Sequence, residues 1–199
     1  THQKQQITEL ARAKGVIRPS DLIPLKLHHR YLYQLVAEGA LMRSGRGLYT
    51  LADFDVTEAH SLVEATRAQS NGVVCLLSAL NFHGLGTQLP FQVWLAVPHG
   101  SRIARTKPVL TRVVVMKSPA YEAGIESHSI EGLPVRIYSV AKTVTDCFKF
   151  RGKIGKDVAL EALREALREK RCTRDEIRKY AKINRVEKVM SPYLEAMTQ

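Results

Sequence analysis

The sequence has few of the residues and segments that mark secreted or membrane proteins. It contains three cysteines, Cys75, Cys147 and Cys172, which are odd in number and widely spaced. We therefore interpret them as free thiols in a reducing compartment, since a disulfide framework needs paired cysteines. There is no signal peptide, no lipidation motif and no apolar run long enough to cross a membrane. We expect a soluble, cytoplasmic protein without a membrane partner.

Motifs of the common enzyme classes are also missing. The chain has no phosphate-binding glycine loop, no Gly-x-Ser-x-Gly elbow and no Cys-x-x-Cys pair. Its seven histidines are scattered, none at metal-ligand spacing, and adjacent His28 and His29 are expected to point to different helix faces. We interpret His83, in SALNFHGL, as a helix-end histidine that satisfies local carbonyl groups. The sequence predicts no metal site and no cofactor.

Acidic residues are absent from a long central stretch. No Asp or Glu occurs between Glu64 and Glu122, whereas a metal-dependent nuclease needs clustered carboxylates near a lysine. A nucleic-acid enzyme of the nuclease type is therefore disfavoured, and we predict that the protein is not an enzyme.

Positive charge is abundant. The formal net charge is +11 and the isoelectric point is near 9.8, which points to DNA, RNA or an acidic protein as the partner. Two basic groups could form a functional face if they adjoin in space, or could simply be solubilising charges. The first group is Arg102, Arg105, Lys107, Arg112 and Lys117, and the second is Lys142, Lys149, Arg151, Lys153 and Lys156.

The first fifty residues have the pattern of a winged helix-turn-helix. Residues 3–14 carry an apolar stripe typical of a helix, and Gly15 can end that helix in a left-handed conformation. A short helix is predicted from Pro19 to about residue 25, and a third over residues 28–38. Residues 41–43 and 48–51 then read as two strands around the turn Ser44-Gly45-Arg46-Gly47.

The third predicted helix leaves a polar face for DNA. With Leu32 and Val36 turned inward, Arg30 and Gln34 fall on the opposite side, and both types of side chain pair with base edges in the major groove. Positions near the helix start and the wing tip suit base and phosphate contacts. The predicted DNA-binding residues are Ser20, Lys26, His28, Arg30, Tyr33, Gln34, Arg43, Ser44 and Arg46.

The remaining chain is long enough for a second core, which we expect to be of the α+β class. The predicted helices cover about 58–69, 74–83, 140–149 with Ser139 as cap, 155–170, a segment opened by the capping box Thr173–Glu176, and 184–197. Residues 73–80 are apolar nearly all round and could be a buried strand or the start of a helix, of which we favour the helix. The predicted strands cover 92–97, 112–117 and a hairpin of 126–130 and 133–138. The predicted organisation is a winged helix-turn-helix over 1–54 and a mixed α+β domain, ending in a helical bundle, over 55–199.

Three segments resemble one known family. GRGLYTL, then VVCLLSALNFHGLGTQLPFQVWLAVP, then VRIYSVAKTVTDCFKFRGKIGKDVALEAL occur in the order found in AbiEi antitoxins, and the similarity runs from about Ile7 to Leu194. The residues that match the later family blocks are Ser78, Ala79, Leu80, His83, Gly84, Trp94, Pro98, Lys142, Thr143, Asp146, Phe148, Arg151 and Gly155.

The resemblance implies a bacterial antitoxin that is also a transcription factor. In that family the winged helix represses its own operon, usually at inverted repeats in double-stranded DNA. The C-terminal domain counters a nucleotidyltransferase-like toxin in a type IV system linked to phage defence. On this reading Arg102, Arg105, Lys107, Lys142, Lys149, Arg151 and Lys153 form the antitoxin surface. The alternative is a stand-alone regulator whose C-terminal domain senses a ligand or dimerises.

Overall fold

The computed structural model describes residues 2–52, 59–105 and 109–197 and divides into two compact units. The first unit comprises Thr1–Ser70, Ile103–Leu110 and His128–Val135, and the second comprises Asn71–Arg102, Thr111–Ser127 and Arg136–Gln199. The predicted domain boundary between residues 54 and 55 lies outside the described residues. Among the helices of the described ranges, none is long and apolar enough to span a membrane.

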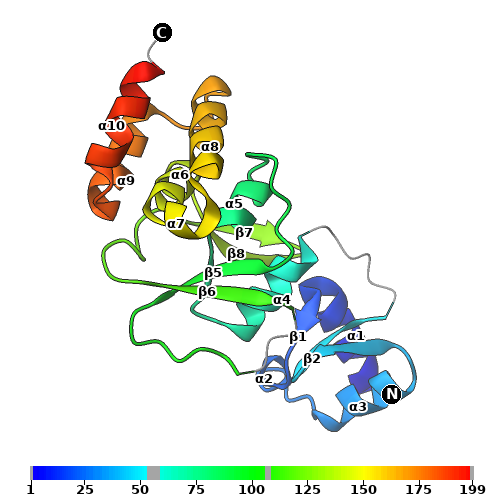
Figure 1. The fold of residues 1–199 in the computed structure, drawn as a ribbon. Helices are drawn as coiled ribbons and strands as arrows, with labels where there is room; N and C mark the ends of the chain where they lie inside the picture. The colour runs from blue at the N-terminus through cyan, green and yellow to red at the C-terminus, as the bar shows by residue number, and fades with distance from the viewer. Residues whose placement is uncertain (1, 53–58, 106–108, 198–199) are drawn as a thin grey trace. The chain divides into compact units, whose positions relative to one another are not determined.

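The N-terminal part of the first unit has the element order predicted for a winged helix. A three-stranded antiparallel sheet in the order β1-β3-β2 packs with the helices α1, α2 and α3, and α4 follows the sheet in the chain (Figure 1). The short strand β1, which pairs with β3, was not predicted. The elements are α1 (His2–Lys14), β1 (Val16–Ile17), α2 (Pro19–Leu22), α3 (Arg30–Ala37), β2 (Leu41–Gly45), β3 (Leu48–Leu51) and α4 (His60–Ala68).

Apolar side chains and two glycines explain this local structure. Ile7 and Ala11 are buried on one stripe of α1 and join the core of the unit. Gly15 ends α1 with a φ of +68°, and its N–H donates to the carbonyl of Ala11 at 2.8 Å. Gly47 adopts a φ of +72° in the turn between β2 and β3. Both positions need a left-handed conformation that favours glycine. Gly15 therefore marks the end of α1, and Gly47 marks the turn of the wing.

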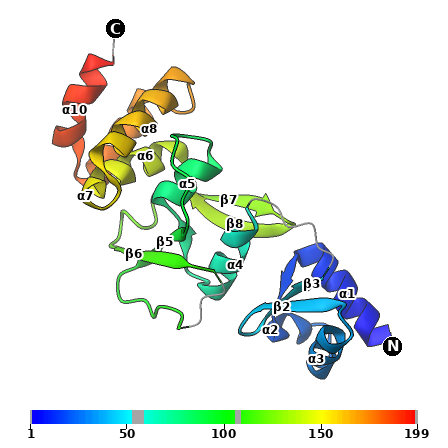
Figure 2. The same ribbon diagram turned by 45° about the vertical axis from the view of Figure 1, so that its right-hand side comes forward.

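A five-stranded mixed sheet in the order β6-β5-β4-β8-β7 and a set of helices make up the rest of the chain (Figure 2). They belong to the second unit except for His128–Val135, around the β7–β8 turn, which belong to the first. Strand β4 runs parallel to β8 and antiparallel to β5, while β5 runs parallel to β6. The strands are β4 (Val73–Val74), β5 (Val93–Pro98), β6 (Thr111–Met116), β7 (Ile125–Ile130) and β8 (Leu133–Tyr138). The helices are α5 (Leu76–Phe82), α6 (Val140–Lys149), α7 (Arg151–Ile154), α8 (Lys156–Arg168), α9 (Arg174–Asn184) and α10 (Glu187–Ala196).

Most predicted elements of this part are present, and the α+β class is confirmed. Ser139 caps α6, and Thr173 forms the predicted capping box with Glu176 at the start of α9. Glu131 and Gly132, both with positive φ, make the turn of the β7–β8 hairpin. One prediction was wrong in part: Val73 and Val74 form strand β4, and the helix starts only at Leu76. A segment that is apolar on all sides has no periodicity to separate a buried strand from a helix.

Helix α6 is the centre of the helical layer. It contacts α5, α8 and α9, and residues 141–148 are all buried. Helices α8, α9 and α10 lie beyond α6 at the C-terminal end of the unit (Figure 1). The apolar core of the second unit therefore joins one face of the sheet to these helices, through side chains such as Trp94, Val144, Phe148, Leu163 and Met190.

Candidate nucleic-acid interface

Helix α3 separates an apolar side from a polar one. Leu32 and Leu35 are 0% and 4% exposed and pack into the core of the winged helix. Arg30, Tyr33 and Gln34 are all exposed. The hydrophobic spacing thus fixes which face of α3 meets the core, and leaves side chains able to read bases on the outer face.

Arg30 is ordered by its neighbours at the start of α3. Its Nη2 donates to the hydroxyl of Tyr31 at 2.9 Å, and its guanidinium lies 4.8 Å from the centre of the Tyr31 ring. The backbone N–H of Arg30 donates to Nδ1 of His28 at 3.2 Å. The N-terminal end of a recognition helix is the part that usually contacts base edges, and Arg30 is the first residue of α3.

Four aromatic rings form a row from the start of α3 to the wing. The rings of His28 and His29 stack with centres 4.7 Å apart, which contradicts the expectation that they point to different faces. That expectation assumed helical geometry, but α3 begins only at Arg30. Tyr33 lies edge-on to both His29 and Tyr49, at 6.4 Å in each case. His29 is exposed and joins the candidate interface, although only its place beside His28 in the sequence hinted at this.

The pKa of Tyr49, on the wing strand β3, is shifted by its surroundings in this row. Burial raises the pKa of Tyr49, and the adjacent Tyr33 raises it further. The Tyr49 side chain is buried, and its ring contact with Tyr33 links the wing strand to α3.

The wing presents two arginines but not the predicted serine. Arg43 and Arg46 are exposed, and Nε of Arg43 donates to the carbonyl of Gly45 at 3.1 Å. The hydroxyl oxygen of Ser44 is buried and finds no hydrogen-bond partner among the described residues. In this conformation Ser44 does not offer its hydroxyl to a phosphate, and Arg43 and Arg46 are the exposed members of the set predicted for the wing.

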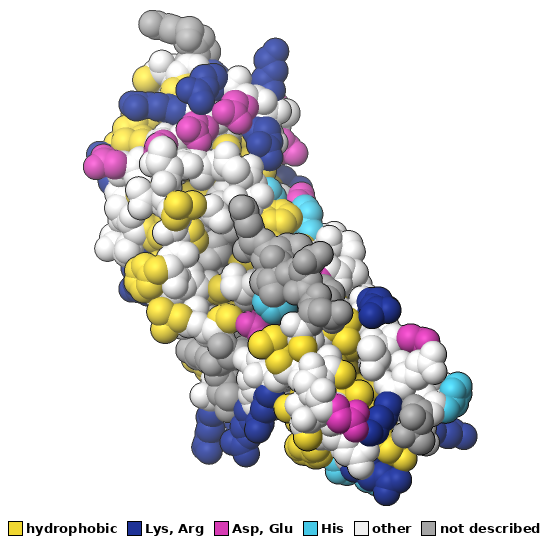
Figure 3. Space-filling model, turned by 90° about the vertical axis from the view of Figure 1, so that its right-hand side faces the viewer, with side chains coloured by type: hydrophobic (Ala, Val, Ile, Leu, Met, Phe, Trp, Pro, Cys, Tyr) yellow, Lys and Arg dark blue, Asp and Glu magenta, His cyan; other side chains and the backbone are white. Residues whose placement is uncertain are grey.

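The connection between α2 and α3 exposes both basic and apolar side chains. Ser20 and Lys26, both predicted phosphate contacts, are exposed. Between them lie Ile23 and Leu25, which are 73% and 53% exposed and were not predicted. Figure 3 shows Lys and Arg side chains next to hydrophobic ones on the surface of the N-terminal unit.

A charged cluster holds α2 in place against α4 within the first unit. Asp21 accepts from Arg67 and from the backbone N–H of Arg18, the latter at 2.8 Å, and lies 3.5 Å from Nζ of Lys14. Burial opposes ionisation of Asp21, but the Arg18 N–H and the charges of Arg67 and Lys14 outweigh it and lower its pKa. The cluster is a structural support, because Asp21 cannot bind a phosphate.

The basic residues predicted for the antitoxin surface fall into different environments. Arg102 and Arg105 are exposed, while Lys107 lies outside the described residues. Lys149, Arg151 and Lys153 are exposed together where α6 meets α7. Nζ of Lys149 and of Lys153 lie 6.0 and 5.8 Å from the centre of the Phe150 ring. Partial burial lowers the pKa of Lys149.

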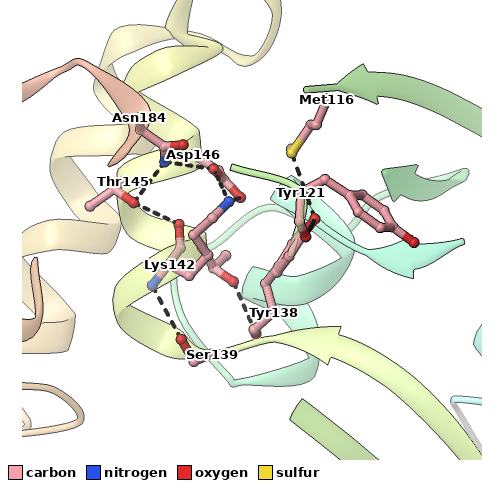
Figure 4. Close-up of polar contacts among 9 residues, drawn as sticks. Met116, Tyr121, Tyr138, Ser139, Lys142, Thr145, Asp146 and Asn184 are labelled. Carbon is pink, nitrogen blue, oxygen red and sulfur yellow. Dashed lines mark hydrogen bonds and ion pairs between the residues drawn. The ribbon is translucent and has the colours of Figure 1, made fainter. Parts of the chain in front are cut away.

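Lys142 does not belong to that surface. Its side chain is fully buried, and Nζ lies 2.5 and 2.6 Å from the two carboxylate oxygens of Asp146, one turn further along α6 (Figure 4). Nζ also lies 4.1 Å from the centre of the Tyr138 ring. A lysine enclosed in this way cannot contact a partner, so its place in the predicted surface was wrong.

The buried pair is completed by residues from other elements. Nδ2 of Asn184 on α9 donates to Asp146 at 2.7 Å and to Oγ1 of Thr145 at 3.0 Å (Figure 4). Burial raises the pKa of Asp146, and Lys142 and Asn184 offset this only in part. The Tyr138 hydroxyl donates to the carbonyl of Tyr121 at 2.7 Å. This polar network connects α6 to α9 and β8 and serves the fold.

His83, Cys75 and Cys147 are buried within the fold. His83 is at the end of α5, as expected, but its Nε2–H donates to the carbonyl of Tyr138 at 2.7 Å, which is distant in sequence. Burial raises the pKa of the Cys75 and Cys147 thiols far above their ordinary value. Within the ranges that the structure describes, no three His, Cys, Asp or Glu residues are grouped to hold a metal ion.

A comparison with known protein families gives a match in the N-terminal unit. Residues 5–52 match the AbiEi family. The matched family is described as "Transcriptional regulator, AbiEi antitoxin", and the match confirms the family resemblance in the winged helix. It supports a regulator or antitoxin role for the chain. No curated protein matches the chain.

One solved structure that is similar to this chain is the RV2827C protein from Mycobacterium tuberculosis. The two share 12% sequence identity with a TM-score of 0.66, over 100% of this chain and 78% of the other. At this identity the similarity shows a common fold, which extends through both units.

Proposed function

We propose that this protein is a transcriptional repressor that binds its own promoter, at inverted repeats in double-stranded DNA. The observation that carries the proposal is the outer face of α3, where Arg30, Tyr33 and Gln34 are exposed opposite the buried Leu32 and Leu35. The family match over residues 5–52 supports the same role.

The contacts divide into two kinds. Arg30 and Gln34 contact base edges in the major groove, with Tyr33 and the histidine pair beside them. Ser20 and Lys26 on one side and Arg43 and Arg46 on the wing contact phosphates, which position the helix without reading sequence. The high positive charge of the chain adds attraction to any DNA.

The second part of the proposal concerns the C-terminal unit. We infer that it is the antitoxin part of a type IV system and counters a nucleotidyltransferase-like toxin, in a role linked to phage defence. The exposed cluster of Lys149, Arg151 and Lys153 around Phe150 is the surface best suited to this task. Arg102 and Arg105 are further exposed positive charges. Neither function requires catalysis.

A reporter experiment tests both parts. A promoter taken from upstream of the gene drives a reporter in a heterologous host, with the protein supplied from a separate plasmid. We expect repression by the wild-type chain and its loss in Arg30→Ala/Gln34→Ala. The double variant should still rescue growth when a toxin encoded next to the gene is expressed, because its C-terminal unit is unchanged.

The outcomes separate the alternatives. Repression without any rescue would indicate a stand-alone regulator, whose C-terminal unit senses a ligand or dimerises. Rescue without repression would contradict the DNA-binding part. Arg178→Ala/Lys188→Ala, which removes two exposed cations from α9 and α10, is the matched control and should repress and rescue like the wild type.

A further inference from the structure

The second unit contains a hollow at the far end of its helices. Its walls come from the C-terminal half of α8, the turn between α8 and α9, the first residue of α9 and the end of α10. These segments lie together at the top of Figure 1. The hollow has a volume of about 800 Å³ and is lined by Arg164, Leu167, Arg168, Lys170, Cys172, Thr173, Arg174 and Met197. This volume lies within the range of small-molecule sites.

Half of the lining residues are cations and none is acidic. The side chains of Arg164 and Lys170 are exposed and form no hydrogen bond or ion pair with another side chain in the described part of the chain. Arg168 lies 3.3 Å from Glu169 and 3.9 Å from Glu165, so its charge is partly compensated. Arg174 is held in place, because its guanidinium donates to the carbonyls of Leu194, at 3.0 Å, and of Met197.

The rest of the lining is apolar or neutral. Leu167, Cys172 and Met197 supply a hydrophobic wall, and Thr173 supplies the only neutral polar side chain. The Cys172 thiol is inert, because burial raises its pKa to about 11. A ligand that fits must combine several negative charges with a weakly polar body. Guanidinium groups bind phosphate oxygens with paired hydrogen bonds.

We propose that this hollow is a binding site for a nucleoside di- or triphosphate. The phosphate groups contact Arg164, Arg168 and Lys170, and the nucleoside lies against Leu167 and Met197. An inorganic anion alone leaves the apolar wall uncovered, and an uncharged nucleoside leaves the cations without a counter-charge. The site is separate from the Lys149–Lys153 cluster and from α3, and it does not depend on the proposed role in DNA binding.

Isothermal titration calorimetry on the full chain tests the site, with ATP, pyrophosphate and adenosine as probes. We expect saturable binding of ATP at one site per chain, weaker binding of pyrophosphate, and no measurable binding of adenosine. Arg164→Ala/Lys170→Ala should weaken ATP binding by about tenfold or more, the effect of losing one or two charge-assisted hydrogen bonds. Both side chains are exposed, so the variant should fold, and circular dichroism checks this.

The matched control is Arg178→Ala/Lys188→Ala, which removes the same charge from outside the hollow. It should bind ATP like the wild type. An equal loss in both double variants would overturn the proposal, because it would mean general attraction to a chain of net charge +11. The absence of saturable ATP binding to the wild-type chain would overturn it as well.

Discussion

Lys142 and Asp146 form an ion pair with no exposed side-chain surface, and Asn184 donates a further hydrogen bond to the same carboxylate. Two charges removed from water stabilise a fold only when each stays paired. The pair lies one helical turn apart on α6, at the point where α6 packs against α9. The integrity of the helical layer therefore depends on both partners.

Replacing one partner should destabilise the second unit strongly. Lys142→Met leaves the Asp146 carboxylate buried without its counter-charge, and we expect a loss of about 3–5 kcal/mol in the free energy of unfolding. Urea denaturation followed by circular dichroism measures it. Lys142→Met/Asp146→Asn should lose much less than the sum of the two single variants, because no charge is left unpaired.

Asp175→Ala is the control for this series. Asp175 lies on α9 with a side chain 91% exposed, and its removal should change the free energy of unfolding by less than about 0.5 kcal/mol. If Lys142→Met were as mild as Asp175→Ala, the ion pair would not contribute to stability as described.

The lowered pKa of Asp21 gives a pH dependence of stability. A carboxylate whose pKa is lower in the folded state stabilises the fold above its unfolded pKa, near about 3.9, and loses that contribution as the pH falls through the folded value. Asp21→Asn removes the charge that pairs with Arg67 and Lys14. We expect a loss of about 1 kcal/mol at neutral pH.

The difference between wild type and Asp21→Asn should shrink as the pH is lowered below about 4, because the wild-type carboxyl is then protonated too. Urea midpoints at several pH values provide the measurement. A difference that stayed constant from neutral to acidic pH would show that the charge of Asp21 is not what holds α2 against α4.

Arg30 should carry sequence discrimination. If its guanidinium pairs with a guanine, Arg30→Ala loses about 1–3 kcal/mol of binding to the operator, and binding to random DNA changes much less. Fluorescence anisotropy with both duplexes measures the two affinities. Arg46→Ala on the wing is the matched control and should weaken both duplexes alike and reduce the salt dependence. Equal losses on both duplexes for Arg30→Ala would exclude it from base reading.

The cluster of Lys149, Arg151 and Lys153 should separate the two proposed activities. Replacing all three by Glu is expected to abolish suppression of the toxin while operator binding stays unchanged. Reversal of Lys179, Lys182 and Lys188, on α9 and α10, is the matched control and should leave both activities intact. Loss of both activities in the first variant would point to misfolding or to a DNA-binding role for the cluster.

The winged helix could be predicted from local sequence because its signals are local. Gly15 and Gly47 mark the end of α1 and the wing turn, and the spacing of Leu32 and Leu35 orients α3. Exposure of Arg30 and Gln34 follows from that spacing. The His28–His29 stack could not be predicted, because it depends on α3 starting two residues later than expected, at Arg30.

The environment of Lys142 required the tertiary structure. Asp146 is only one turn away in sequence, but the burial of the pair depends on Asn184 and on Gly124, where an added Cβ would lie 2.7 Å from Cβ of Lys142. Strand β4 also required the tertiary structure, because its two residues are recognisable as a strand only through their pairing with β5 and β8. The hollow lined by Arg164 and Met197 likewise brings together residues distant in sequence.

The N-terminal unit is proposed to read a specific DNA sequence. A salt-titrated gel shift tests it directly, with the full chain on the DNA immediately upstream of its gene and on a scrambled duplex of equal length. We expect a clear preference for the upstream DNA that persists at about 150 mM salt, where attraction to phosphates alone discriminates little. Equal affinity for both duplexes at that salt concentration would contradict the claim and leave the winged helix as a general nucleic-acid contact.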